Sequence, residues 1–283
     1  MAPREVWDLA ASPPSFASRD GLDAMLAPRE RREPFALATV IETHGSVSAK
    51  TGSKAVIGRD GRILAGWVGG GCAEGAVSHS ALDGLETGET AIIDLDLNDE
   101  VLGTGMPCGG TMRVFVEPIR PKPRLWILGH GKVAETLCTI AAAIGFEVVI
   151  DDPMADPARY PSAARLLTDD LDYSRLDPGE DDCVVVATQH KGDHQSMARC
   201  LRSPVPYIGL VASRKRSRLV LDYLREQGFG ETELKRVYAP AGLDLGARSP
   251  EEIALSVLSE IVMLRHKAGG AARRLEMART AEA

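Results

Sequence analysis

The second half of the chain alternates short apolar runs with segments of helical periodicity. Four runs are predominantly apolar, as parallel strands are when both of their faces are buried. They occupy residues 125–128, 146–150, 183–187 and 207–211. Between the first two runs, apolar positions from 133 to 144 recur at the spacing of one helix face. Strands that alternate with helices predict a doubly wound α/β domain with a parallel sheet.

The first half has a different pattern. Phe35 to Glu42 alternates apolar and polar positions, as a half-buried strand does, and further strands are predicted on the same grounds. These are residues 54–57, 62–68, 91–95 and 113–116. A single helix, about Cys72 to Leu85, interrupts them. A run of strands with one helix predicts an α+β domain that precedes the α/β domain.

Three prolines within six residues separate the two patterns. Pro118, Pro121 and Pro123 cannot donate to a strand ladder, so this stretch is predicted to be a semi-rigid connector. We therefore expect an α+β domain over residues 1–118, a linker over 119–123, the α/β domain over 124–268 and a tail over 269–283.

Composition adds limits on function. The chain has 283 residues, 44% hydrophobic and 26% charged, with a net charge of −7. These values are ordinary for a globular protein and exclude a generally basic nucleic-acid binder. The acidic excess lies in residues 1–118, which hold 10 basic and 17 acidic side chains, so the first domain could offer an acidic docking face.

The five cysteines indicate a reducing compartment. The N-terminus lacks the basic-then-apolar pattern of a signal peptide, and no apolar run reaches the ~18 residues of a membrane span. An odd count without a CxxC pair argues against a disulfide framework and against a zinc ribbon. We therefore expect a cytoplasmic protein with free thiols, in which Cys138, Cys183 and Cys200 belong to the core.

A glycine motif follows the first strand of the second domain. Gly129-x-Gly131-x-x-Ala134 fits the dinucleotide fingerprint of a Rossmann-like fold, in which backbone N–H groups and a helix N-terminus approach a pyrophosphate. Asp151 lies 20 residues after Gly131, where an acid would bond a ribose hydroxyl. The glycines could instead serve only close helix–strand packing. Nucleotide binding alone does not make a dehydrogenase, and no YxxxK pair supports hydride transfer.

Two polar clusters follow later strands, at the edge of the sheet where ligands bind in such folds. After Ala187, the cluster includes His190, Asp193 and His194, which could bond a ligand, bind a metal or, at Asp193, cap the next helix. After Val211, Ser213, Arg214 and Lys215 open a run of four cations in five residues. That run is either a solvated face or a site for an anion such as phosphate.

Two glycine-rich loops of the first domain each contain a cysteine. Gly69, Gly70 and Gly71 precede Cys72 at the start of the predicted helix, and their N–H groups could cradle an anion. A thiolate is favoured at a helix N-terminus. Cys108 lies in the second loop, residues 103–110. Either cysteine could be an inert buried thiol, but their placement in two such loops indicates a functional role.

Taken together, these motifs resemble the xanthine dehydrogenase accessory proteins, which include those of carbon monoxide dehydrogenase. The resemblance runs in order from about residue 35 to 265. Its elements are residues 38–40 with 45–46, 69–77, 108–110, 129–134, 208–216, 241–247 and 250–254.

The resemblance implies a maturation chaperone rather than an enzyme. Such proteins bind the molybdenum cofactor (molybdopterin or its cytosine dinucleotide), hold it while a cysteine desulfurase supplies sulfur, and insert it into a molybdenum hydroxylase. It implies a homodimer, and it makes Cys72 and Cys108 candidates for the molybdenum end. Gly129, Gly131, Asp151 and residues 213–215 become candidates for the nucleotide or phosphate end, and Lys132 for an added phosphate contact.

Two other functions stay open on the sequence. An NAD(P)-dependent oxidoreductase would use the Rossmann-like site. A purely structural adaptor would dock the hydroxylase to its sulfur donor through the acidic first domain and would not need Cys72 or Cys108.

Overall fold

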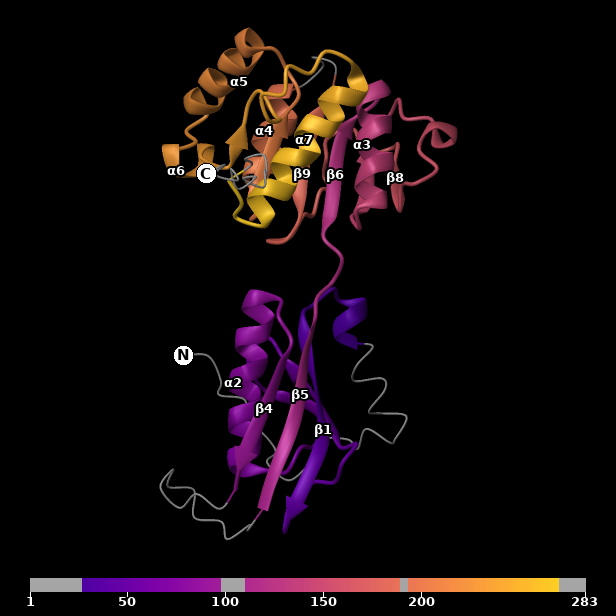
Figure 1. The fold of residues 1–283 in the computed structure, drawn as a ribbon. Helices are drawn as coiled ribbons and strands as arrows, with labels where there is room; N and C mark the ends of the chain where they lie inside the picture. Colours follow the sequence, from indigo (N-terminus) through magenta and orange to yellow (C-terminus); the bar gives the residue numbers. More distant parts are fainter. Residues whose placement is uncertain (1–26, 98–109, 189–192, 270–283) are drawn as a thin grey trace, which may run out of the picture. The chain divides into compact units, whose positions relative to one another are not determined.

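In a computed structural model, the chain divides into two compact units, residues Met1–Pro121 and Lys122–Ala283. The structure describes residues 27–97, 110–188 and 193–269. Each unit has its own sheet and its own buried core (Figure 1). Of the tail predicted over 269–283, all but residue 269 lies outside the described residues.

Unit 1 is a five-stranded antiparallel sheet with one helix on it. The strand order is β3-β2-β1-β5-β4, and every pairing is antiparallel. The strands are β1 (Phe35–Gly45), β2 (Lys54–Gly58), β3 (Ile63–Gly66), β4 (Ala91–Asp96) and β5 (Gly110–Ile119). Helix α2 (Gly71–Thr87) buries Ala73, Val77 and Ala81 against one face of the sheet (Figure 1). The apolar positions of β1 alternate so that this face forms the core.

Unit 2 is built on a six-stranded parallel sheet of order β11-β10-β9-β6-β7-β8. Its strands are β6 (Arg124–Gly129), β7 (Glu147–Asp151), β8 (Arg165–Leu167), β9 (Cys183–Ala187), β10 (Tyr207–Leu210) and β11 (Val237–Tyr238). Chain order runs outward from β6 to β8 and then outward from β9 to β11. The direction therefore reverses between β6 and β9, which is the switch point where Rossmann folds bind their ligands.

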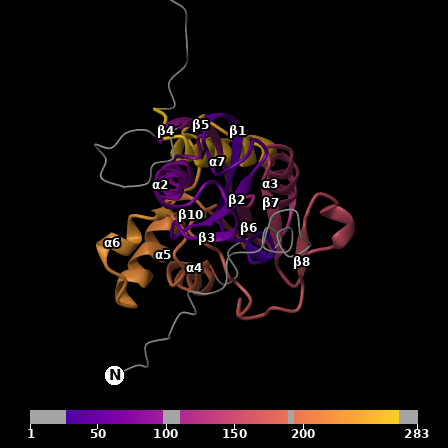
Figure 2. The same cartoon turned by 90° about the horizontal axis from the view of Figure 1, so that it is seen from below.

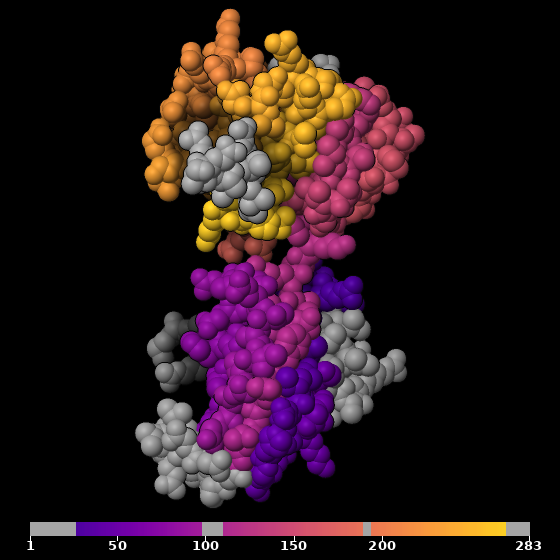
Figure 3. Space-filling view, in the orientation of Figure 1, coloured from indigo at the N-terminus to yellow at the C-terminus, as the bar shows by residue number. Residues whose placement is uncertain are grey.

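Helices cover both faces of this sheet. Helix α3 (Lys132–Ala143) packs beside α7 (Pro250–Arg265) on one face, and α4 (Asp193–Leu201) packs beside α5 (Arg214–Glu226) on the other. Figure 2 shows α4 beside α5, and in Figure 3 the yellow α7 lies at the surface. The short α6 (Glu231–Leu234) and the 3-10 turn η2 (Pro157–Arg159) complete the described elements. No described helix combines the length and apolar character of a membrane span.

The predicted fold class is confirmed: an α+β unit precedes a Rossmann-type α/β unit. Helix α7 begins at Ser249-Pro250-Glu251-Glu252, where Ser at the N-cap, Pro in the first turn and Glu three residues after the Ser form a sequence pattern that predicts a helix start. The Ser249 hydroxyl accepts a hydrogen bond from the Glu252 N–H, and the Glu252 carboxylate accepts one from the Ser249 N–H. Strands β8 and β11 were not predicted, because two or three residues carry too little periodicity to be recognised.

Candidate functional site

A cavity of about 900 Å³ opens at the switch point of unit 2. It is lined by the turn after β6, the start of α3, the end of β9 and the turn from β10 into α5. The segment between β11 and α7 closes the cavity and supplies the longest run of lining residues. The lining residues are 130, 132, 133, 187, 211–214, 240–247, 253 and 256. Parallel strands place all their carboxyl ends at one edge, so these segments meet although they are far apart in sequence.

Two helix N-termini meet the cavity, and each has a cation at its first position. Lys132 begins α3 and Arg214 begins α5, and both line the cavity. The first turn of α5 holds no acidic side chain, so its cations lie at the positive end of the helix dipole, where they are unfavourable without an anion. Lys215 follows Arg214 but is exposed outside the lining. The arrangement suits an anionic group such as phosphate.

The fingerprint loop is held by side chains from the segment after β7. His130 Nδ1 lies 3.0 Å from Asp152 Oδ1, and because the carboxylate only accepts, this ring nitrogen carries the proton. The Gly131 N–H donates to the Tyr160 hydroxyl at 3.1 Å. Burial raises the pKa of Tyr160 to about 12, so it remains a phenol. No pattern in the sequence indicated a role for Asp152, Tyr160 or His130.

Gly129 is required by packing. Its φ is +131°, and a β-carbon there would lie 2.2 Å from the Ala187 carbonyl oxygen of the neighbouring strand β9. No side chain fits that distance, so β6 and β9 can approach this closely only with glycine. The packing role that the sequence left open for the fingerprint glycines therefore holds for Gly129.

Asp151 is not placed to bond a ribose. Its side chain has no exposed surface, and neither of its carboxylate oxygens has a hydrogen-bond partner among the described residues. It faces the same core as Val149, because alternate strand residues share a face. Burial and the nearby Asp170 raise the pKa of Asp151 to about 7. Counting residues from Gly131 selected this acid, whereas strand alternation buries it and leaves Asp152 beside the loop.

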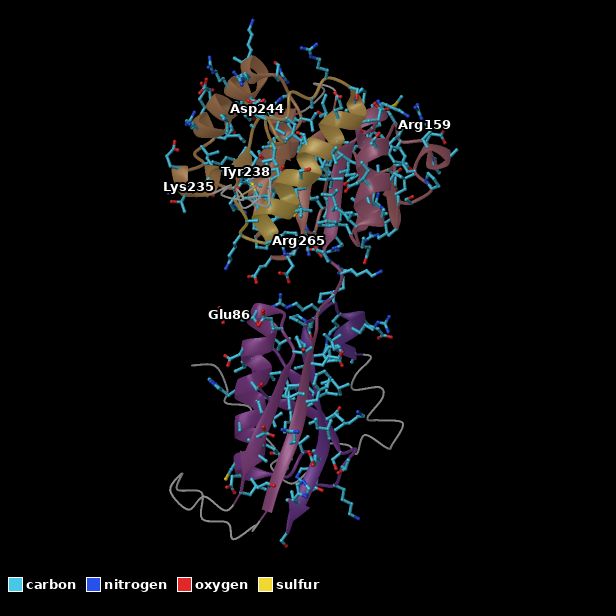
Figure 4. All side chains as sticks on the ribbon, viewed as in Figure 1. Glu86, Arg159, Lys235, Tyr238, Asp244 and Arg265 are labelled. Carbon is cyan, nitrogen blue, oxygen red and sulfur yellow. The ribbon has the colours of Figure 1, made fainter. Side chains whose placement is uncertain are left out.

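The segment that closes the cavity is anchored on α7. Glu260 is buried, and its Oε2 accepts hydrogen bonds from the Tyr207 hydroxyl at 2.7 Å and from the Gly242 N–H at 2.9 Å. Tyr207 stacks on Tyr238, with ring centroids 4.7 Å apart. Figure 4 labels Tyr238 and Asp244, which lies further along the same segment and lines the cavity. Only the family resemblance of residues 241–247 pointed to this segment in the sequence.

The glycine loop of unit 1 places Cys72 in the first turn of α2. Gly69, Gly70 and Gly71 have φ values of +122°, +69° and +50°, a run that only glycines adopt readily. The Ser48 hydroxyl donates to the Gly69 carbonyl at 3.0 Å. Cys72 is a free, partly exposed thiol. Cys108 lies outside the described residues, so a meeting of the two cysteines stays a prediction.

The other cysteines in the described chain are buried. Desolvation raises the pKa of Cys138 to about 11 and that of Cys183 to about 12, and it raises the pKa of Cys200 further. His190 and the side chain of Asp193 lie outside the description, although Asp193 begins α4. Within the described residues, no three His, Cys, Asp or Glu side chains gather as metal ligands would.

Family comparisons agree with this architecture. The model described as "XdhC Rossmann domain" matches residues 125–261, and the one described as "XdhC and CoxI family" matches residues 29–96. The two matches cover most of both units. The chain belongs to this family, the xanthine dehydrogenase accessory proteins.

Three curated relatives carry further information. The uncharacterised protein YqeB of Escherichia coli is 31% identical over 85% of this chain and 45% of its own length. A probable xanthine dehydrogenase subunit of Bacillus subtilis is 34% identical over 56% of this chain and 47% of its own. The molybdenum cofactor insertion chaperone PaoD of E. coli is 23% identical over 81% and 83%. The chain spans about half the length of the first two relatives.

Among solved structures, a xanthine dehydrogenase from Bacillus halodurans aligns with a TM-score of 0.44 at 22% identity. The alignment covers 89% of this chain and 97% of that one.

Proposed function

We propose that this chain is a maturation chaperone that holds the molybdenum cofactor during sulfuration and inserts it into a molybdenum hydroxylase. Family membership supports the proposal, as does the likeness to a protein named for cofactor insertion. The observation that carries it is the switch-point cavity, where Lys132, Arg214 and two helix N-termini face one space. A carrier needs such a binding site and needs no group that turns over a substrate.

The residues of the cavity fit a pterin that bears a phosphate. Cations and helix N-termini complement the charge of the phosphate. Val133, Val211 and Ile253 line the same space and offer apolar contact to a planar ring. Asp244 also lines the cavity, and its carboxylate can accept hydrogen bonds from ring amino groups or hydroxyls.

Cys72, with Cys108, is assigned to the molybdenum end of the cargo. A thiolate is a soft ligand, and Cys72 combines partial exposure with a place in the first turn of a helix. The buried thiols of Cys138, Cys183 and Cys200 cannot reach a cargo without unfolding. In this proposal the protein works in the cytoplasm as a homodimer, receives sulfur from a cysteine desulfurase, and serves a client of xanthine or carbon monoxide dehydrogenase type.

The test is purification from cells that make the cofactor, followed by oxidation and fluorescence assay of the bound pterin. The wild-type protein should carry pterin well above a control protein, and it should raise the activity of the client hydroxylase during maturation. Pterin at background level, also after incubation with added cofactor, would sink the proposal.

Matched variants test which residues hold the phosphate end of the cofactor and which hold its molybdenum end. Lys132→Ala with Arg214→Ala should lower bound pterin, whereas Arg218→Ala, an exposed cation on the same helix outside the lining, should not. Cys72→Ala with Cys108→Ala should leave much of the pterin bound and abolish maturation of the client. Full maturation by the double cysteine variant would favour the structural adaptor.

A further inference from the structure

The cavity of unit 2 covers only one half of a dinucleotide site. In a Rossmann fold a dinucleotide spans the switch point, with one nucleoside over the first two strands and the other beyond it. Here the lining comes from the turn after β6, the start of α3, the end of β9, the β10–α5 turn, the segment before α7, and α7 itself. No described residue of β7 or β8 lines it, so the half that would receive the first nucleoside does not belong to the cavity.

Three residues close that missing half. His130 is tied to Asp152, whose Oδ1 also accepts from the Met154 N–H at 2.7 Å. The Tyr160 hydroxyl accepts a hydrogen bond from the Gly131 N–H. In a dinucleotide fingerprint this N–H would donate to the pyrophosphate instead. An ion pair anchors this segment, since Arg159 Nε lies 2.7 Å from Glu135 Oε1 on α3 (Figure 4 labels Arg159).

Neither acid at the end of β7 is available for a ribose. The Asp151 carboxylate has no exposed surface, and Asp152 is 7% exposed and already bonds His130 and the Met154 N–H. A dinucleotide would therefore have to break the His130–Asp152 contact and displace Tyr160. A smaller ligand that reaches the cavity from the β9 and β10 side needs neither change.

We infer that this cavity selects a phosphate monoester of mononucleotide size and rejects pyrophosphate-linked dinucleotides such as NAD(P). A monoester carries close to two negative charges near neutral pH, as a phosphorylated side chain does. Lys132, Arg214 and the N-termini of α3 and α5 supply the complementary charge. The inference rests on the proposed function and sharpens it, because the form of cofactor that fits is the pterin with a terminal phosphate.

The test is calorimetric titration of the full chain at low salt. The monoester probes are CMP and 6-hydroxymethylpterin phosphate, and cytidine, 6-hydroxymethylpterin and NAD⁺ are the comparisons. At least one monoester should bind at least tenfold more tightly than its phosphate-free parent and than NAD⁺. If CMP binds, the phosphate that the cavity recognises belongs to a nucleotide, and if 6-hydroxymethylpterin phosphate binds, it belongs to a pterin.

Variants test which residues make the cavity prefer a monoester to a dinucleotide. Lys132→Ala with Arg214→Ala should weaken the monoester at least tenfold, and Arg218→Ala should leave it unchanged. His130→Ala with Tyr160→Phe opens the closed half, so it should raise the affinity for NAD⁺ at least fivefold. Tyr160→Phe alone frees the Gly131 N–H with little change of volume, and it should give part of that gain.

Three results would overturn the inference. The first is a dissociation constant for NAD⁺ within threefold of that for the monoester. The second is cytidine or 6-hydroxymethylpterin binding as tightly as its phosphate monoester. The third is that neither monoester binds to protein whose circular dichroism is native. The outcome is separate from that of the cofactor assay. Monoester binding by protein that acquires no cofactor would refute the proposed function alone, whereas cofactor loading without monoester selectivity would refute this inference alone.

Discussion

The two units contain the same local motif in different surroundings. In each, a strand leads through glycines with positive φ into a helix, at Gly69–Gly71 before α2 and at Gly129 and Gly131 before α3. In unit 1 the sheet is antiparallel, so the ends of neighbouring strands point in opposite directions. In unit 2 the strands are parallel, and the loops after β6, β9 and β10 share one edge.

A glycine loop is therefore only one part of a site. The loop in unit 1 presents one thiol at one helix N-terminus. The loop in unit 2 becomes one wall of a cavity, because the parallel sheet brings the start of α5 and the segment before α7 against it.

The largest effect is expected at Gly129. Gly129→Ala would place its β-carbon 2.2 Å from the Ala187 carbonyl oxygen, at a φ of +131°. It should lower the free energy of unfolding of unit 2 by about 3 kcal/mol or more, through overpacking and strain. Gly71→Ala is the control, since nothing lies within 4 Å of its added carbon and only its φ of +50° is unfavourable. Gly71→Ala should cost about 1 kcal/mol in urea unfolding, and equal costs would contradict the comparison.

Asp151→Asn should stabilise unit 2 in a pH-dependent way. The folded pKa of about 7 lies above that of an unfolded aspartate, so the folded state binds more protons between roughly pH 4 and 7, and stability falls as pH rises through that window. At pH 8 the substitution should raise the free energy of unfolding by about 1–3 kcal/mol. At pH 4.5 the gain should nearly vanish, and melting curves at both pH values measure it.

The control for that variant is Asp170→Asn. Burial opposes ionisation of Asp170, but hydrogen bonds from the Arg175 and Ser174 N–H groups and the Ser174 hydroxyl lower its pKa. Its loss should therefore destabilise the protein at pH 8. A gain of similar size from both variants would mean that Asp151 is not the protonated member.

Tyr207→Phe should loosen the segment that closes the cavity. It removes the donor 2.7 Å from Glu260 Oε2 and leaves a buried carboxylate with the Gly242 N–H. We expect a loss of about 0.5–1.5 kcal/mol in stability, the usual net contribution of one intramolecular hydrogen bond. Weaker phosphate binding should accompany it. Tyr238→Phe keeps the stacked ring and should change both by much less, and equal effects would argue against an anchoring role for the hydroxyl.

Cys72→Ser should have the smallest effect on stability, within about 0.5 kcal/mol, because the side chain is partly exposed. In the native wild type, iodoacetamide should label Cys72 quickly and Cys138, Cys183 and Cys200 slowly, since burial raises the pKa of those three thiols. Peptide mass mapping follows each site. Fast labelling of the buried three in folded protein would contradict the structure.

Much of the fold could be predicted from the sequence, because its signals are local. The apolar run at Cys183–Ala187 predicted β9 with its observed bounds, and the cap at Ser249 predicted the start of α7. The glycine positions before α2 and α3 were also predicted, since a chain that must take positive φ there needs glycine.

The site was predicted less well, because its residues come together only in three dimensions. Asp151 and Asp152 are neighbours, and residue counting could not decide which one faces the loop. That choice depends on which face of β7 each side chain shares with Val149 or Val148. Tyr160 reaches Gly131 from a 3-10 turn without periodicity, and Glu260 reaches Gly242 from the far end of the domain.

Periodicity, capping and φ are properties of short segments, so the two fold classes, the cap at Ser249 and the glycines before α2 and α3 can be recognised in the sequence. Burial and hydrogen-bond partners depend instead on strand order. Only the folded chain therefore shows which acid is buried, that the Tyr160 hydroxyl accepts from the Gly131 N–H, and that three loops enclose one cavity. Strand order joins residues 130, 214 and 242 across more than 100 positions of the chain.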